Sequence, residues 1–352
     1  SDYIESDMDG YQVQYDDTKN CVVLAVDPAA HAKTCTSHSS LNEGTEFIPW
    51  TDAEAKSQYN SNSKTASNSL PSQTGSYYLT GPVTLDAEWA PANDTVLCLN
   101  GQTITSTEAE MTFRVATGKT LVLTDCQNTG ALVYSGDISN GQHIGVYVDG
   151  GSFTMYNGTV KGFTTGVLVL NKFVMHGGSI INSRDVGVQN NGTFEMYGGN
   201  ITGNGGGASL TGCGVFDNGT MTVGGDATVQ NNKNKSDGPA CNVCLARYGS
   251  NNKLVPITVE DGFTGSFGVT TSNPPYVDLP HQVTSGGMIE KITSDNAEKY
   301  EIVAKERNLW LQVVKREPTA ITAPQAVSGL IYDGTTQTGV PAGEGYKLTG
   351  ST

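Results

Sequence analysis

The chain has 352 residues, which is enough for one large domain or for two to three average ones. Its 43 glycines and its charged-residue content of 16% are typical of short strands joined by tight turns, and they argue against a helical protein. Twenty Lys and Arg residues against 35 Asp and Glu residues give a formal net charge of −15, which argues against nucleic acid as a partner.

Residues 1–70 are predicted to form an irregular N-terminal cap. Residues 52–69 are polar and carry almost no large apolar side chains. A stack of repeats needs a cap because an open terminal coil exposes its core and the edges of its strands. The chain starts at Ser1 without a basic and apolar leader, so we expect that a signal peptide was removed or that the N-terminus was trimmed.

One candidate metal site lies in this cap. His31, Cys35 and His38 follow Cys21, and these ligand types suit zinc. A disulfide between Cys21 and Cys35 is the simpler interpretation, because the seven cysteines form no repeated CxxC pair of the kind that builds a zinc ribbon. Calcium-binding repeats of the Gly-Gly-x-Gly-x-Asp type are missing. We therefore predict no cofactor, with zinc or calcium as the open alternatives.

Residues 71–315 are predicted to be a parallel β-helix. Residues 76–106 and 112–136 read as its first coils, with short apolar strands between Gly and Asn turns. Four units then follow at intervals of 21, 21 and 27 residues, beginning at Gly145, Gly166, Gly187 and Gly214. These intervals are too short for a βαβ unit of about 30 residues and too long for a hairpin, but they suit one coil of several short strands.

Two columns of apolar residues define the register of these coils. The first column is aromatic or Met, and the second, two residues later, is Met or Val. The columns are Phe153, Phe173, Phe194 and Met221, then Met155, Met175, Met196 and Val223. A two-residue strand period places both columns on the same face. Coils stacked at roughly 4.8 Å would therefore bury them as ladders in one continuous core.

Two cysteines occupy equivalent places in successive coils. Cys213 precedes a Gly-Val pair, and Cys241 precedes Asn242 and Val243. Equivalent positions in adjacent coils lie within disulfide reach. We predict a Cys213 to Cys241 disulfide, with Cys244 as the competing partner, under the oxidising conditions found outside the cell.

The repeat pattern ends before the last part of the chain. Residues 316–329 are punctuated by proline and are predicted to be a linker. Residues 330–352 read as strand, turn and strand, which is too little to fold alone, so we expect a truncated β module that continues beyond Thr352. No run approaches the roughly 18 consecutive apolar residues of a membrane span, and none is predicted.

Several stretches resemble the adhesin-like β-helix proteins of anaerobic gut bacteria, whose fold is similar to that of the pectate lyases. They are LPSQTGSYYLTGPVTL with LCLNGQTIT, the GGxI and GGxxT coils, and NVCL with FTGSFGVTTSNPPY and VTSGG. The likeness covers about Leu70 to Val314, and LIYDGTTQTG resembles the opening of small Ig-like surface repeats. The resemblance implies an all-β protein with a single-stranded, right-handed parallel β-helix, secreted or displayed on the cell wall.

An enzyme of the pectate lyase or polygalacturonase type would need chemistry on the coils. Glycoside hydrolysis uses two carboxylates about 5 to 10 Å apart. The carboxylates from successive coils are Asp149, Asp185, Glu195 and Asp217. Asp149 and Asp217 fall at nearly the same place after Gly-Val, with Asn190 in the coil between, which suggests a polar ladder that faces outward. Solvated turn residues are the alternative interpretation, and it is the one we favour.

Aromatic and basic side chains of the coils are candidates for binding a sugar. They are Tyr147, Tyr156, Tyr197 and Arg184. Tyr156 and Tyr197 sit beside glycine-containing turns, where an aromatic ring more often covers the corner of its own coil than a ligand.

We therefore predict an extracellular, adhesin-like binding protein that presents a rigid β-helix to a host or dietary glycan or to a host surface protein. A repeated flat face suits an extended polymer or a large partner better than a small molecule. The alternatives are a carbohydrate-active enzyme, either a glycoside hydrolase or a polysaccharide lyase, and a purely structural spacer.

Overall fold

A computed structural model describes most of the predicted β-helix and short parts of the N-terminal segment. The described residues are 11–16, 21–26, 47–50, 70–71, 73–139, 141–207, 212–246, 254–277 and 279–315. Contacts within the chain divide it into two units, Ser1–Val313 and Val314–Thr352. The predicted linker and the predicted C-terminal β module lie outside the described residues, as does most of the predicted cap. All regular elements of the described part are strands.

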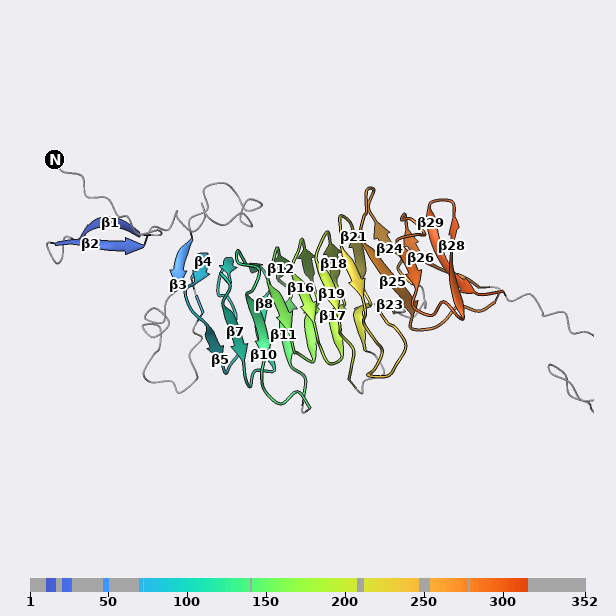
Figure 1. Cartoon of the computed structure of the whole chain (residues 1–352), viewed down its shortest axis with the longest axis horizontal. Helices are drawn as coiled ribbons and strands as arrows, with labels where there is room; N and C mark the ends of the chain where they lie inside the picture. The colour runs from blue at the N-terminus through green and yellow to red at the C-terminus, as the bar shows by residue number, and fades with distance from the viewer. Residues whose placement is uncertain are drawn as a thin grey trace, which may run out of the picture. The chain divides into compact units, whose positions relative to one another are not determined.

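The strands of the central part form the coils of a parallel β-helix (Figure 1). In one coil, β11 (Ile144–Asp149), β12 (Ser152–Met155) and β13 (Thr159–Lys161) follow one another. Each pairs in parallel with its equivalent in the next coil, β14 (Thr165–Val169), β15 (Lys172–Met175) and β16 (Ser179–Ile181). Each coil thus has three faces, and the chain advances by one strand spacing per coil. The all-β parallel β-helix predicted from the sequence is confirmed.

Face I consists of the strands that begin each coil. They are β8 (Met111–Ala116), β11, β14, β17 (Val186–Asn190), β20 (Cys213–Asp217) and β23 (Val243–Leu245). Face II follows it in every coil. Its strands are β3 (Ile48–Trp50), β4 (Gly75–Leu79), β6 (Thr95–Cys98), β9 (Thr120–Thr124), β12, β15, β18 (Thr193–Met196), β21 (Thr220–Val223), β24 (Ile257–Val259) and β26 (His281–Ser285).

Face III completes each coil. Its strands are β5 (Val83–Leu85), β7 (Thr103–Ser106), β10 (Ala131–Tyr134), β13, β16, β19 (Asn200–Thr202) and β22 (Thr228–Gln230). Strand β25 (Ser266–Thr271) pairs with β22 at its start and with β23 at its end, so it joins faces III and I. Strand β27 (Ile292–Ser294) pairs in parallel with β25.

Antiparallel strands occur at both ends of the described part. Near the C-terminal end, β28 (Tyr300–Lys305) and β29 (Asn308–Val313) form an antiparallel pair, and β29 also pairs with β26. This pair covers the edge of face II and adds Leu309 and Leu311 to the core, which protects an otherwise open sheet edge. In the N-terminal segment, β1 (Tyr11–Asp16) and β2 (Cys21–Val26) are antiparallel partners, a regular element in a segment expected to be irregular.

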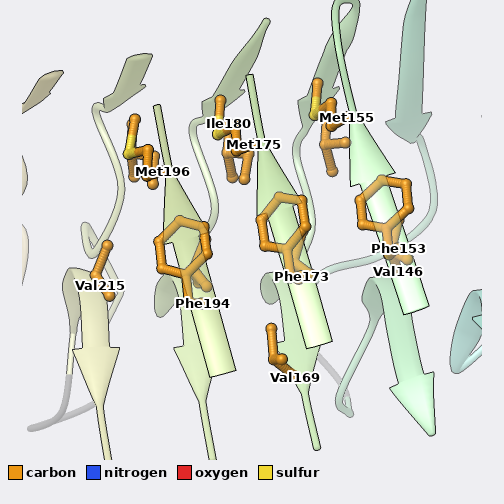
Figure 2. Close-up of a cluster of buried hydrophobic side chains, with 14 of the residues drawn as sticks. Val146, Phe153, Met155, Val169, Phe173, Met175, Ile180, Phe194, Met196 and Val215 are labelled. Atoms are coloured by element: carbon orange, nitrogen blue, oxygen red, sulfur yellow. The ribbon is translucent and has the colours of Figure 1, made fainter. Parts of the chain in front are cut away.

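The core contains the predicted columns in the predicted register (Figure 2). Phe153, Phe173 and Phe194 lie one above the other, with ring centroids 4.9 and 5.0 Å apart and ring planes within 14° of parallel. All three rings are fully buried, and the Met column beside them is buried as well. Full burial of one such side chain contributes about 1.5–3 kcal/mol, so the ladder is a main source of stability.

A column of glycines explains the repeated Gly-Val pair. A Cβ atom on Gly187 would lie 2.6 Å from the backbone oxygen of Gly214 and 2.9 Å from Nδ2 of Asn204. Glycine is therefore required at this inner corner because a neighbouring side chain occupies the space that a methyl group would fill.

That neighbouring side chain belongs to a ladder of buried polar residues. Its members are the buried Ser183, Asn204, Asn232 and Asn242 and the partly exposed Asp295. Asn232 and Asn242 both belong to the connection between β22 and β23, and Asp295 follows β27. Each asparagine accepts a hydrogen bond on Oδ1 from the backbone N–H of the previous member, at 2.9 to 3.0 Å. Nδ2 of Asn232 also donates to the carbonyl of Ile201 at 2.9 Å. The ladder thus satisfies backbone groups that the turns would leave buried and unpaired.

We expect Asn232→Ala to lower the free energy of unfolding by about 2 to 4 kcal/mol, because buried donors and acceptors on two coils lose their partner. The matched control is Gln230→Ala, two residues earlier at the exposed end of β22, with an expected change of about 0.5 kcal/mol or less. Urea unfolding followed by circular dichroism measures both. Equal destabilisation by the two substitutions would contradict the role given to the ladder.

Candidate functional site

The outer side of face II carries the most promising group of side chains. In β12, β15 and β18 the Phe and Met residues point inward, so the residue that follows each Met emerges on the outside. These residues are Tyr156, His176 and Tyr197, which we call the aromatic column. Backbone hydrogen bonds of 2.8 Å from His176 to Met155 and from Tyr197 to Met175 keep them in register.

The three rings of the aromatic column stack on one another. The centroids of Tyr156 and His176 lie 4.7 Å apart, and those of His176 and Tyr197 lie 5.5 Å apart, with ring planes inclined by 11° and 21°. His176 is exposed and both tyrosines are partly exposed. Because the rings largely cover each other's faces, the groups left for a partner are ring edges, hydroxyls and the imidazole nitrogens.

A charged pair lies beside the aromatic column. Lys172 Nζ lies 2.9 Å from Glu195 Oε1, and the Tyr197 hydroxyl donates to Glu195 Oε2 at 3.4 Å. The side chain of Lys172 is 44% exposed and that of Glu195 is 23% exposed. An ion pair this exposed contributes at most about 1 kcal/mol to stability, so its main effect is to orient the groups around Tyr197.

Burial and nearby carboxylates shift the pKa values of two side chains in this site. Burial raises the pKa of Tyr197, and Glu195 and Glu260 raise it further. Burial lowers the pKa of His176 below its ordinary value, while Glu195 acts in the opposite direction. Both side chains are therefore mainly neutral at pH 7, and the His176 imidazole offers one donor and one acceptor.

The aromatic column ends at a glycine in the next coil. A Cβ atom on Gly224 would lie 3.0 Å from Cδ1 of Tyr197 and 2.8 Å from Oε2 of Glu260. The Tyr197 ring and the Glu260 carboxylate therefore both lie against Gly224, and a larger residue at this position would clash with them. This arrangement adds a second carboxylate to the neighbourhood of Tyr197.

Two other groups of the predicted site residues lie apart from the aromatic column. On face I, Arg114 donates to Asp149 through Nε at 3.0 Å and through Nη2. Burial and the nearby Asp149 carboxylate raise the pKa of Tyr147. Arg184 pairs with Asp185, with Nη2 and Oδ2 3.2 Å apart, and also donates to the backbone carbonyl of Ile138. Each carboxylate thus has a guanidinium partner, and Nη1 of Arg114 also lies 3.9 Å from Oε1 of Glu88.

Asp217 does not belong to an outward ladder, and that prediction is wrong. Asn190 and Asp217 occupy one inward column with Val169 and Leu245, and their side chains are buried. Asp149 comes one residue later in its coil, where it pairs with Ala116. Because side chains alternate between the two sides of a strand, a shift of one residue moves the carboxylate from the core to the surface. The solvated-turn interpretation fails for Asp217 for the same reason.

The buried Asn190 and Asp217 form a satisfied pair. Asn190 Nδ2 donates to Asp217 Oδ1 at 2.6 Å, and the backbone N–H of Gly219 donates to the same oxygen at 3.4 Å. Burial raises the pKa of Asp217 from 3.8 to about 6, although both hydrogen bonds act in the opposite direction. The Asp217 carboxylate therefore lies inside the coil and does not face a substrate.

The remaining predictions concern the cysteines and the cap. The structure joins Cys213 and Cys241 by a disulfide, the pair that the sequence favoured. The candidate metal ligands His31, Cys35 and His38 lie outside the described residues.

Sequence reasoning missed His176, Lys172 and Glu260 as members of the site. The repeat carries a signal for His176, because it follows Met175 as Tyr156 follows Met155. Glu260 gives no such signal, since it comes from the longer coil after β24 and reaches Tyr197 only through the fold.

Comparison with known proteins identifies no matching family model, no matching curated protein and no matching solved structure. The resemblance to adhesin-like β-helix proteins therefore stays a prediction. The described part of the chain contains no helix with the length and apolar character that a membrane crossing requires.

We expect Asp217→Asn to stabilise the protein at pH 7 and to have little effect at pH 4. A folded pKa of about 6 lies above the unfolded value, so the stability linked to this group is present below pH 4 and is lost as the pH rises through 6. The buried charge then costs about 3 kcal/mol at pH 7, and the amide of the variant can still accept from Gly219.

Urea unfolding of both proteins at pH 4 and pH 7 measures this difference. Asp149→Asn serves as the control, because its carboxylate is partly exposed and paired with Arg114, so its loss brings no gain at pH 7. A variant at Asp217 that is no more stable than the wild type at pH 7 would show that the carboxylate is not a buried charge.

Proposed function

We propose that this chain is the binding part of an adhesin-like surface protein, and that the aromatic column on face II binds a neutral, extended glycan. The observation that carries the proposal is the column itself. Tyr156, His176 and Tyr197 repeat once per coil, with ring centroids 4.7 and 5.5 Å apart. This spacing is close to the length of one sugar residue in an extended polysaccharide, so successive sugars could meet successive ring edges.

The scaffold behind the aromatic column supports a binding role. Met155, Met175 and Met196 are fully buried directly beneath it, so the rings stand on a close-packed core. A rigid row of aromatic and polar groups loses little conformational entropy when a ligand binds. Tyrosine in particular combines a large contact area with a polar hydroxyl, which suits a surface that is partly apolar and partly wet.

Charge favours a neutral ligand over an acidic one. The formal net charge of −15 repels polyanions such as pectin fragments and sulfated glycans at a distance. Beside the column, Lys172 is engaged by Glu195, so this lysine is already neutralised. A neutral plant polysaccharide or a neutral host glycan is therefore the ligand class we infer. The resemblance to proteins of gut bacteria supports an extracellular location, where both are abundant.

A carbohydrate-active enzyme is the second candidate, and one observation favours it. Glu195 and Glu260 both lie close enough to Tyr197 to raise the pKa of its hydroxyl, so two carboxylates flank one partly exposed ring. Glycosidases work with two carboxylates around the scissile bond. The other predicted carboxylates do not support this role, because Asp149 and Asp185 are ion-paired elsewhere and Asp217 is buried.

We expect Tyr197→Ala to weaken glycan binding at least about tenfold, a loss of about 1.4 kcal/mol. The reason is that the substitution removes one hydroxyl and one ring edge from the aromatic column. The matched control is Tyr147→Ala, a partly exposed tyrosine on face I, which should bind as the wild type does. The assay is an array of neutral plant oligosaccharides, mucin-type glycans and acidic pectin fragments, followed by calorimetry on the best neutral glycan.

Three results would contradict the binding proposal. They are equal losses in both tyrosine variants, a preference for the pectin fragments, and no retained glycan at all. If the chain bound a host surface protein and no glycan, that protein would replace the glycan as the proposed ligand. New reducing ends or unsaturated products that disappear in Glu195→Gln would support the enzyme, and silence in every assay would favour a structural spacer.

A further inference from the structure

Three cysteines converge where β20 and β23 lie side by side. Cys213 is the first residue of β20, Cys241 comes just before β23, and Cys244 lies within β23. The strand register brings them together, because the Gly214 N–H donates to the Cys241 carbonyl at 2.9 Å and Phe216 pairs with Cys244. The three sulfur atoms all lie within 4.8 Å of one another, and all three residues are buried.

In this structure two cysteines of the cluster are oxidised to a disulfide and the third is a free thiol. Cys213 and Cys241 form a disulfide, and Cys244 stands outside this bond. A structural disulfide between adjacent coils explains two of the cysteines but gives the third no role. Cys244 lies nevertheless in contact range of both.

We propose that reduction of the Cys213–Cys241 disulfide turns the three cysteines into a binding site for one soft divalent metal ion, Zn²⁺ or Cd²⁺. Thiolates are the ligands that such ions prefer in proteins, and three converging sulfurs supply three of the four positions of a tetrahedral site.

Sequence spacing supports the proposal independently of the distances. Cys241 and Cys244 are separated by two residues, which is the CxxC spacing of many zinc sites. The third ligand, Cys213, comes from the preceding coil. Two ligands from one short segment and one from a neighbouring strand make a site that depends on the folded stack.

The space beside the cysteines can admit an ion and a fourth ligand. A cavity of about 310 Å³ is lined by all three cysteines, and Asn296 and Thr271 line the same cavity. Its volume exceeds that of a metal ion with one bound water. A water molecule or a small anion can therefore complete the coordination shell, as in zinc sites that keep one open position.

The charges around the cavity favour a cation. Burial, together with the nearby carboxylates of Asp295 and Asp217, raises the pKa of the Cys244 thiol to about 12. Without a metal, this thiol is a poor nucleophile. A bound divalent cation offsets the charges of the thiolates and carboxylates, as metal sites do when they bind deprotonated cysteines.

The chemistry requires one reductant and then the metal. A dithiol donates two electrons to the Cys213–Cys241 disulfide, is itself oxidised to a disulfide, and leaves two protein thiols. Binding of one divalent ion then forms three metal–sulfur bonds and releases three protons. The resulting metal–trithiolate unit carries one negative charge.

The test uses variants of the whole chain in which the three cluster cysteines are the only cysteines left. The other four cysteines are replaced by serine, namely Cys21, Cys35, Cys98 and Cys126. The protein is reduced with a dithiol, freed of it without oxygen, and titrated with Cd²⁺ while the thiolate-to-cadmium absorption band is recorded. We expect one cadmium ion per reduced chain, no band in the oxidised protein, and a clear loss of affinity after Cys244→Ser.

A second measurement keeps the test valid if the four-serine protein does not fold. Cadmium-113 NMR of the reduced wild type distinguishes three sulfur ligands from two, and Cys244→Ser in the same chain should remove the three-sulfur signal. The proposal is overturned if the reduced protein binds no cadmium at the cluster, if Cys244→Ser binds equally well, or if the oxidised protein binds as tightly as the reduced one. Loss of the β-sheet circular dichroism on reduction, with or without Cd²⁺, also overturns it.

Discussion

The in-register stacking of coils is the constraint on which the other features depend. Each buried side chain meets its own equivalent one coil away, so a column is stable only if all its members fit. Phe173 lies between Phe153 and Phe194, and Gly187 leaves the space that the Asn204 side chain needs. Apolar, glycine and asparagine columns are therefore interdependent, and a change in register would break all three at once.

The same register places groups on the outside that are far apart in sequence. It aligns Tyr156, His176 and Tyr197 along face II, and it brings Cys213 to the CxxC pair of the next coil. The scaffold fixes the position and spacing of these groups but leaves their chemistry free to vary. A repeated fold of this kind can carry different ligands without changing its core, which is why function must be argued from the site.

The core could be predicted because its signal repeats. Phe and Met recur at a two-residue offset in every unit, so the inward columns were readable without the structure. Asn190 and Asp217 were misread because composition places polar residues outside, whereas their position in the strand places them inside. Glu260 and the antiparallel β28 and β29 carry no repeat signal, since they occur where the coils lengthen or end. Their positions depend on tertiary contacts.

The register of neighbouring coils is tested most directly by a cross-link on the outside of face II. Thr154 and Val174 are direct partners in β12 and β15, and both are partly exposed. The double variant Thr154→Cys with Val174→Cys should form a new disulfide under mild oxidation, detected by mass spectrometry of peptides. Thr154→Cys with Lys172→Cys, displaced by two residues, should not. A link in the displaced pair, or none in the aligned pair, would contradict the stacked β-helix.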